Sequence, residues 1–120
     1  MELKIMQKTY DLALYLYPAL RQFPKSEKHT MAAEIKKTLF RIMRLITRAN
    51  KARRKRELLA ELDAELELLR QQNRLAMELG FLPFRKYEIT SRYLAEIGKM
   101  LGGWINLSSS YLKEQYSDSF

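Results

Sequence analysis

The stretch IKKTLFRIMRLITRANKARRKR, residues 35–56, determines the fold that we expect for this chain. Its apolar residues recur at spacings of three and four, and at about 100° per residue they fall within roughly 40° of one line. This stripe consists of Ile35, Leu39, Ile42, Ile46 and Ala49. The pattern predicts an amphipathic helix that ends near Asn50 and starts near residues 26–30, with Ser26 or Thr30 as its N-cap.

The same stretch concentrates the positive charge of the chain. It holds ten basic residues and no acidic residue, whereas the whole chain has a net charge of +8. Six of the ten are arginines, whose planar guanidinium suits bidentate binding of phosphate. Nine of the ten lie on the helix face opposite the apolar stripe or directly after it, and we call these nine the basic ridge: Lys37, Arg41, Arg44, Arg48, Lys51, Arg53, Arg54, Lys55 and Arg56.

The basic ridge is compatible with several roles. We favour binding to the phosphate backbone of nucleic acid without base readout, because an acid-free row of charge attracts polyanions. One alternative is a passive solvated face that acids of other helices neutralise, and another is an interface for acidic proteins. A membrane-surface helix is the weakest alternative, since the opposite face is needed for the core.

The chain is expected to turn just after the ridge, because the hydrophobic phase changes there. The next stripe would coincide with the basic ridge if one helix continued through both, and it consists of Leu59, Leu62, Leu66, Leu69 and Ala76. We therefore expect a turn between Asn50 and Glu57. Similar stripes predict helices over residues 3–21 and 83–105, with Pro18 kinking or displacing the last turn of the first and Gly80 closing the third. Four such helices with short links predict an all-α fold, an up-down-up-down four-helix bundle.

The chain of 120 residues suits one domain, which we place at residues 1–106. Gly102-Gly103 could end the last helix or let a neighbour approach, and residues 107–120 are expected to form a flexible or weakly docked tail. Several apolar residues lie off the main stripes, and a small bundle cannot easily bury all of them: Leu12, Tyr15, Leu16, Phe40, Leu45, Leu68 and Leu75. They predict a second apolar surface and therefore a homo-oligomer.

Composition argues against several kinds of chemistry. The chain has no Cys and a single His, so neither a metal site nor another cofactor is expected, and His29 fits a surface or capping residue. Glu61 and Glu65 lie one turn apart but lack the histidine partners of a di-metal bundle. The longest apolar run, residues 12–20, is too short to span a membrane, and residues 1–8 lack the apolar core of a signal peptide. We expect a non-catalytic protein of the cytoplasm.

Asn73 falls on the apolar line of residues 57–79, between Leu69 and Ala76. Two explanations stay open at this point. The amide could be buried and satisfied by a core partner such as a tyrosine hydroxyl, or it could set the register across a subunit interface.

Two segments carry a resemblance to a known family. The first is Tyr15-Leu16-Tyr17-Pro18, preceded by Tyr10 and followed by Phe23-Pro24-Lys25, and the second is LAEIGKMLGGWI, residues 94–105. Over residues 5–106 the chain resembles the accessory variability determinant (Avd) proteins of diversity-generating retroelements. The second segment is shared with the ribosomal-RNA intervening-sequence proteins, a related four-helix-bundle group, whereas the first segment and the basic character favour the Avd branch.

The resemblance implies a homopentameric, ring- or barrel-like assembly of four-helix protomers in the cytoplasm. It also implies a protein without catalytic activity that binds the retroelement's reverse transcriptase and template RNA or cDNA, and that supports mutagenic reverse transcription. The alternatives are a ribosomal-RNA-associated intervening-sequence bundle and a purely protein-binding structural oligomer. The basic ridge lies outside both matching segments, so its residues are assigned on charge alone.

Overall fold

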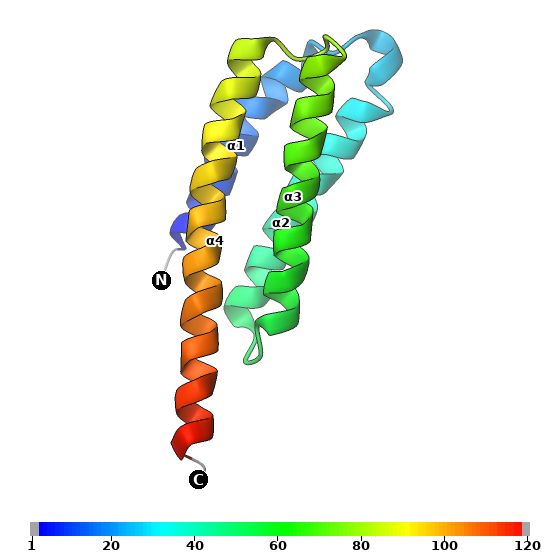
Figure 1. The fold of residues 1–120 in the computed structure, drawn as a ribbon. Coiled ribbons are helices and arrows are strands. Elements are labelled where there is room, and N and C mark those ends of the chain that lie inside the picture. Colours follow the sequence, from blue (N-terminus) through cyan, green and yellow to red (C-terminus); the bar gives the residue numbers. More distant parts are fainter. Residues whose placement is uncertain (1–2, 119–120) are drawn as a thin grey trace.

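The computed structural model describes the backbone of residues 3–118 and the side chains of residues 3–109. Within this range the chain forms α1 (Lys4–Arg21), the short 3-10 helix η1 (Lys25–Glu27), α2 (Met31–Lys51), α3 (Arg56–Glu78) and α4 (Phe84–Asp118). The four α-helices alternate in direction and lie side by side in a long, narrow bundle (Figure 1). The predicted up-down-up-down four-helix bundle is therefore confirmed.

The helices are arranged as a ring of neighbours. α1 packs against α2 and α4, and α3 packs against the same two helices. The backbones of the diagonal pairs, α1 with α3 and α2 with α4, stay apart in the part of the chain that the structure describes. Each helix consequently buries the face toward the bundle axis and exposes the opposite face to solvent.

The predicted stripes of α2 and α3 form the core. All five apolar stripe residues of α2 are buried, and so are those of α3. The expectation for the off-stripe residues was wrong in part, because Leu12, Leu16 and Leu45 are also buried within the single chain. A helix with two neighbours buries an arc wider than its narrowest apolar line, which explains this difference. Phe40, Leu68 and Leu75 remain exposed, by 56%, 40% and 48%.

The turns follow the local chemistry of the sequence, with one exception. α2 ends at Lys51 and α3 begins at Arg56, which confirms the predicted turn. Gly80 adopts a φ of 82° just after α3, the left-handed conformation that closes helices. Thr30 is the N-cap residue of α2, as one of the two capping predictions had it, but its hydroxyl donates to Glu27 Oε2 at 2.6 Å and makes no capping hydrogen bond, and Ser26 lies in η1.

α4 continues as a helix through Gly102-Gly103 to Asp118, so the glycine pair does not end it. Its last turns run past the end of the bundle that carries the α2–α3 turn (Figure 1). We predicted that residues 107–120 form a flexible or weakly docked tail. Most of their side chains lie outside the described residues, so this stays a prediction. Among the described residues, no helix combines the length and apolar character that crossing a bilayer requires.

Candidate nucleic-acid interface

The structure places the basic ridge along the solvent face of α2, through the α2–α3 turn and onto the first residue of α3. Seven of its nine side chains belong to exposed residues: Lys37, Arg44, Arg48, Lys51, Arg53, Arg54 and Arg56. The other two, Arg41 and Lys55, are partly buried. The nine residues therefore form one continuous surface, but they do not all present a free charge.

Arg41 is engaged with α3. Its Nε donates to Glu65 Oε2 at 3.0 Å, and its Nη2 donates to the hydroxyl of Thr38 at 3.0 Å. Glu65, which lies one turn after Glu61, is thus the partner of an arginine from another helix. Lys37 also has a carboxylate partner, since its Nζ lies 3.3 Å from Glu34 Oε1, one turn upstream on α2. Both contacts reduce the charge available to a ligand.

Lys55 closes the end of α2. Its Nζ donates to the carbonyl oxygens of Ala49 at 2.6 Å, Asn50 at 3.4 Å and Ala52 at 2.7 Å. Carbonyl groups at a helix C-terminus lack intrahelical donors and carry the negative end of the helix dipole, so an ammonium group stabilises them. The sequence did not predict that Lys55 stabilises the end of α2. A lysine four residues beyond the end of a helix is its only sequence signal.

Six ridge residues are left exposed and without an ion-pair partner among the described residues: Arg44, Arg48, Lys51, Arg53, Arg54 and Arg56. They extend from the C-terminal half of α2 to the start of α3, so they gather at one end of the bundle. Five of the six are arginines. This surface can bind several phosphates of a polyanion at once, and its attraction will weaken as salt increases.

The NH2 group of the Asn73 amide has its hydrogen-bond partners within its own chain, which agrees with the first explanation for this group only. Asn73 is 4% exposed, and its Nδ2 donates to Ser91 Oγ at 3.2 Å and to the Tyr87 carbonyl at 3.3 Å. The partners are therefore a serine and a backbone carbonyl of α4, not a tyrosine hydroxyl. The Asn73 Oδ1 atom has no hydrogen-bond partner in the structure.

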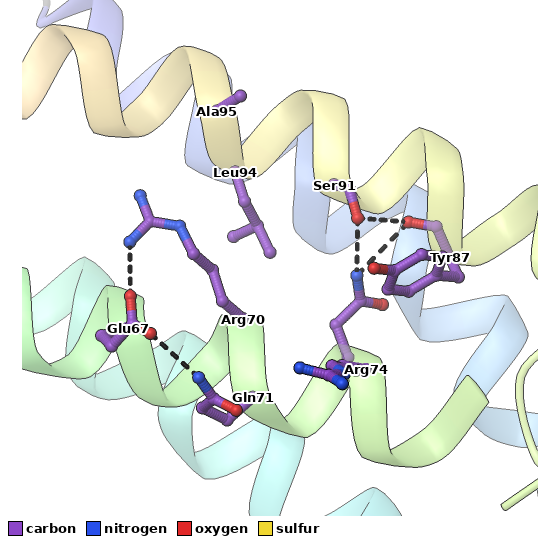
Figure 2. Close-up of a pocket in the computed structure, with 9 residues that line it drawn as sticks. Glu67, Arg70, Gln71, Arg74, Tyr87, Ser91, Leu94 and Ala95 are labelled. Carbon is purple, nitrogen blue, oxygen red and sulfur yellow. Dashed lines mark hydrogen bonds and ion pairs between the residues drawn. The ribbon is translucent and has the colours of Figure 1, made fainter. Parts of the chain in front are cut away.

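These contacts lie at one side of a groove between α3 and α4 with a volume of about 270 Å³ (Figure 2). Arg70 extends from α3 toward α4 and donates to Glu67 at 3.0 Å. Hydrogen bonds from Gln71 and Arg70 hold the pKa of Glu67 below its ordinary value, and Glu78 raises the pKa of Arg74. Because acids of α3 already engage both arginines, the groove offers little to an anion.

Gly98 gives Arg70 the room to reach α4. A Cβ atom built at Gly98 would lie 2.6 Å from Arg70 Nη2, a distance that forces the guanidinium to move. Gly98 therefore lets a side chain of α3 approach α4 closely. At Gly102 a Cβ atom would meet nothing within 4 Å.

The fold and the surface together define a basic four-helix bundle whose free arginines gather at one end of the molecule. This chain belongs to the bAvd-like family, whose model matches residues 3–108. The match confirms the resemblance drawn from the Tyr-Leu-Tyr-Pro segment and from residues 94–105. No curated protein sequence matches the chain.

Proposed function

We propose that this protein is a non-catalytic accessory protein of a diversity-generating retroelement. In this proposal it binds the reverse transcriptase and the template RNA or cDNA in the cytoplasm, and it supports mutagenic reverse transcription. Membership of the bAvd-like family over residues 3–108 is the observation that carries the proposal. The six free bases of the basic ridge support the nucleic-acid part, because a surface of this kind favours phosphate backbones.

The proposal includes assembly into a homopentamer, as the family resemblance implies. Phe40 on α2 and Leu68 and Leu75 on α3 support an assembly, since large apolar side chains exposed by 40–56% favour contact with another surface. Multi-angle light scattering of the purified chain measures the oligomeric state. A monomer at micromolar concentration would contradict this part of the proposal.

The nucleic-acid part is tested by charge reversal at two exposed ridge residues. Arg44→Glu/Arg48→Glu should weaken binding to template RNA and reduce the slope of log K against log salt, by about 0.7–0.9 for each lost phosphate contact. Lys25→Glu/Lys28→Glu is the matched control, because it changes the net charge equally at exposed residues ahead of α2. Equal effects of the two double variants would show that net charge, and not the ridge, determines affinity.

The protein partner is tested separately. Size-exclusion chromatography of the full chain mixed with the purified reverse transcriptase of the same retroelement should give a joint peak, in the absence and in the presence of nuclease. A joint peak that disappears with nuclease would mean that nucleic acid alone connects the two proteins. Separate elution under both conditions would contradict the proposed partner.

A further inference from the structure

Two tyrosines and two lysines form a row along the seam between α1 and α4. Lys86 Nζ lies 5.6 Å from the centroid of the Tyr15 ring, and the Tyr15 and Tyr93 ring centroids are 5.9 Å apart. At the other end of the row, Lys8 Nζ lies 5.7 Å from the Tyr93 ring centroid. All four residues are partly exposed, so the row is accessible from solvent. We call these four residues the α1–α4 seam.

A line of bases borders the seam on the outer face of α4. Arg85, Arg92 and Lys99 recur every seven residues, which places them within roughly 40° of one line. All three are exposed, and none forms an ion pair with another described residue. Because α2 and α4 are diagonal in the bundle, this line faces away from the basic ridge.

Two acids near the seam have partners, whereas Glu88, an exposed residue one helical turn from both Arg85 and Arg92, has none among the described residues. Glu96 Oε2 lies 2.7 Å from Lys8 Nζ, so these two charges compensate each other. Asp11 Oδ1 accepts a hydrogen bond from Gln7 at 2.9 Å. Lys86 lies over the Tyr15 ring and has no carboxylate partner in the described chain. The three bases of the line also lack such a partner there. The seam therefore combines free positive charge with adjacent aromatic rings.

We propose that the α1–α4 seam is a binding site for single-stranded nucleic acid. Bases stack on Tyr15 and Tyr93, while Lys86, Arg92 and Lys99 bind the phosphates. Aromatic rings beside a positive surface are the usual means by which proteins bind unpaired strands, because every base has a face that can stack. A duplex gains little from the rings, since its bases are already stacked and paired. This site is separate from the basic ridge, and it rests on the proposed function, because the template RNA offers unpaired bases.

The geometry of the seam allows Lys86 to move when a ligand binds. An ammonium group over an exposed tyrosine ring contributes only modestly to stability, so Lys86 can move from the ring to a phosphate at small cost. A base then takes the ring face that the ammonium leaves. At the other end of the row Lys8 is paired with Glu96, and its Nζ lies 5.7 Å from the centroid of the Tyr93 ring.

Fluorescence anisotropy with a labelled oligo(dT) of about 12 nucleotides, and with a duplex of the same length, tests the site in the full-length chain. Tyr15→Leu/Tyr93→Leu should weaken oligo(dT) binding by about tenfold or more and leave duplex binding unchanged. Tyr17→Leu is the matched control, because Tyr17 belongs to the same helix and has Lys36 Nζ 5.1 Å from its ring, but on the side toward α2. The control should bind oligo(dT) like the parent protein.

Two results would overturn the seam assignment. The first is equal oligo(dT) affinity in the Tyr15→Leu/Tyr93→Leu and Tyr17→Leu proteins, and the second is an equal loss for oligo(dT) and duplex. Should the double tyrosine variant fail to fold, the exposed variant Arg92→Gln/Lys99→Gln decides the question. Its salt slope for oligo(dT) should decrease by about 1.4, and an unchanged slope refutes the site. Loss at the seam and loss at the basic ridge are distinguishable, because the seam variants lie on α1 and α4 and the ridge variants on α2.

Discussion

Arg41 Nε lies 3.0 Å from Glu65 Oε2, and this ion pair is the one that joins α2 to α3 in the described part of the chain. The side chains are 38% and 23% exposed, so the pair is only partly screened by water. Arg41 also donates to Thr38, a buried residue of its own helix. Arg41 therefore connects two helices, whereas Arg44 and Arg48 further along the ridge have no such contact.

Arg41 should consequently contribute more to stability, and Arg44 more to nucleic-acid binding. Arg41→Gln is expected to lower the free energy of unfolding by about 0.5–1 kcal/mol, because it breaks the contact with Glu65. Arg44→Gln should leave stability within about 0.5 kcal/mol of the parent and weaken nucleic-acid binding more than Arg41→Gln does. Urea denaturation and anisotropy titration measure the two quantities. The reverse order of the two affinities would show that the Arg41 charge is free after all.

Lys55 and Lys51 provide a second contrast within the ridge. Lys55→Met should cost about 1–2 kcal/mol of unfolding free energy, because the carbonyl oxygens of Ala49 and Ala52 lose a charged donor. Lys51→Met removes the same charge from an exposed residue and should change stability by less than about 0.5 kcal/mol. Equal stability of the two variants in urea would mean that water replaces the Lys55 ammonium without cost.

Thr90 is fully buried, yet its Oγ1 has no hydrogen-bond partner in the structure. Thr90→Val keeps the shape and removes an unsatisfied hydroxyl, so it should stabilise the protein by about 1 kcal/mol. Thr38→Val is the control, because the Thr38 hydroxyl donates to the Glu34 carbonyl and accepts from Arg41. It should destabilise by about 1 kcal/mol. Thermal unfolding followed by circular dichroism should move the two midpoints in opposite directions.

The lowered pKa of Glu67 predicts a pH dependence of stability. Gln71 and Arg70 favour the ionised carboxylate, so its folded pKa lies below the ordinary value of 4.5. The stability that Glu67 contributes is therefore complete above that ordinary value and is lost as the pH falls through the lowered folded pKa. The difference in unfolding midpoint between the parent and Glu67→Gln should be largest near neutral pH and should vanish in acid. A difference that stays constant with pH would contradict the assignment.

The fold could be predicted from sequence because its signals are local. The hydrophobic phase changes between Asn50 and Glu57, and no continuous helix can bury both stripes. The position of the Thr30 N-cap was predictable, but the partner of its hydroxyl was not, since Glu27 lies close enough to accept the same hydrogen bond. Burial of Leu12, Leu16 and Leu45 depends on the rotation of each helix about its own axis and on the width of the face that its two neighbours cover. The apolar stripe of one helix does not specify either.

The candidate site was predictable as a concentration of charge, but not residue by residue. Arg41 and Glu65 are 24 residues apart, so only the packing of α2 on α3 brings them together. Lys55 lies in the turn and folds back on the end of α2, because the turn between α2 and α3 is short. The bases on α4 were not predicted for another reason. Residues 57–120 contain more acids than bases, and that sum conceals the exposed row of Arg85, Arg92 and Lys99 on α4.

The diagonal placement of α2 and α4 has a mechanical consequence. Across its long axis the molecule measures 24 × 23 Å between its outermost Cα atoms. Two strands held on these opposite sides would run along the same axis with a rigid apolar wall between them, so they could neither pair nor exchange places.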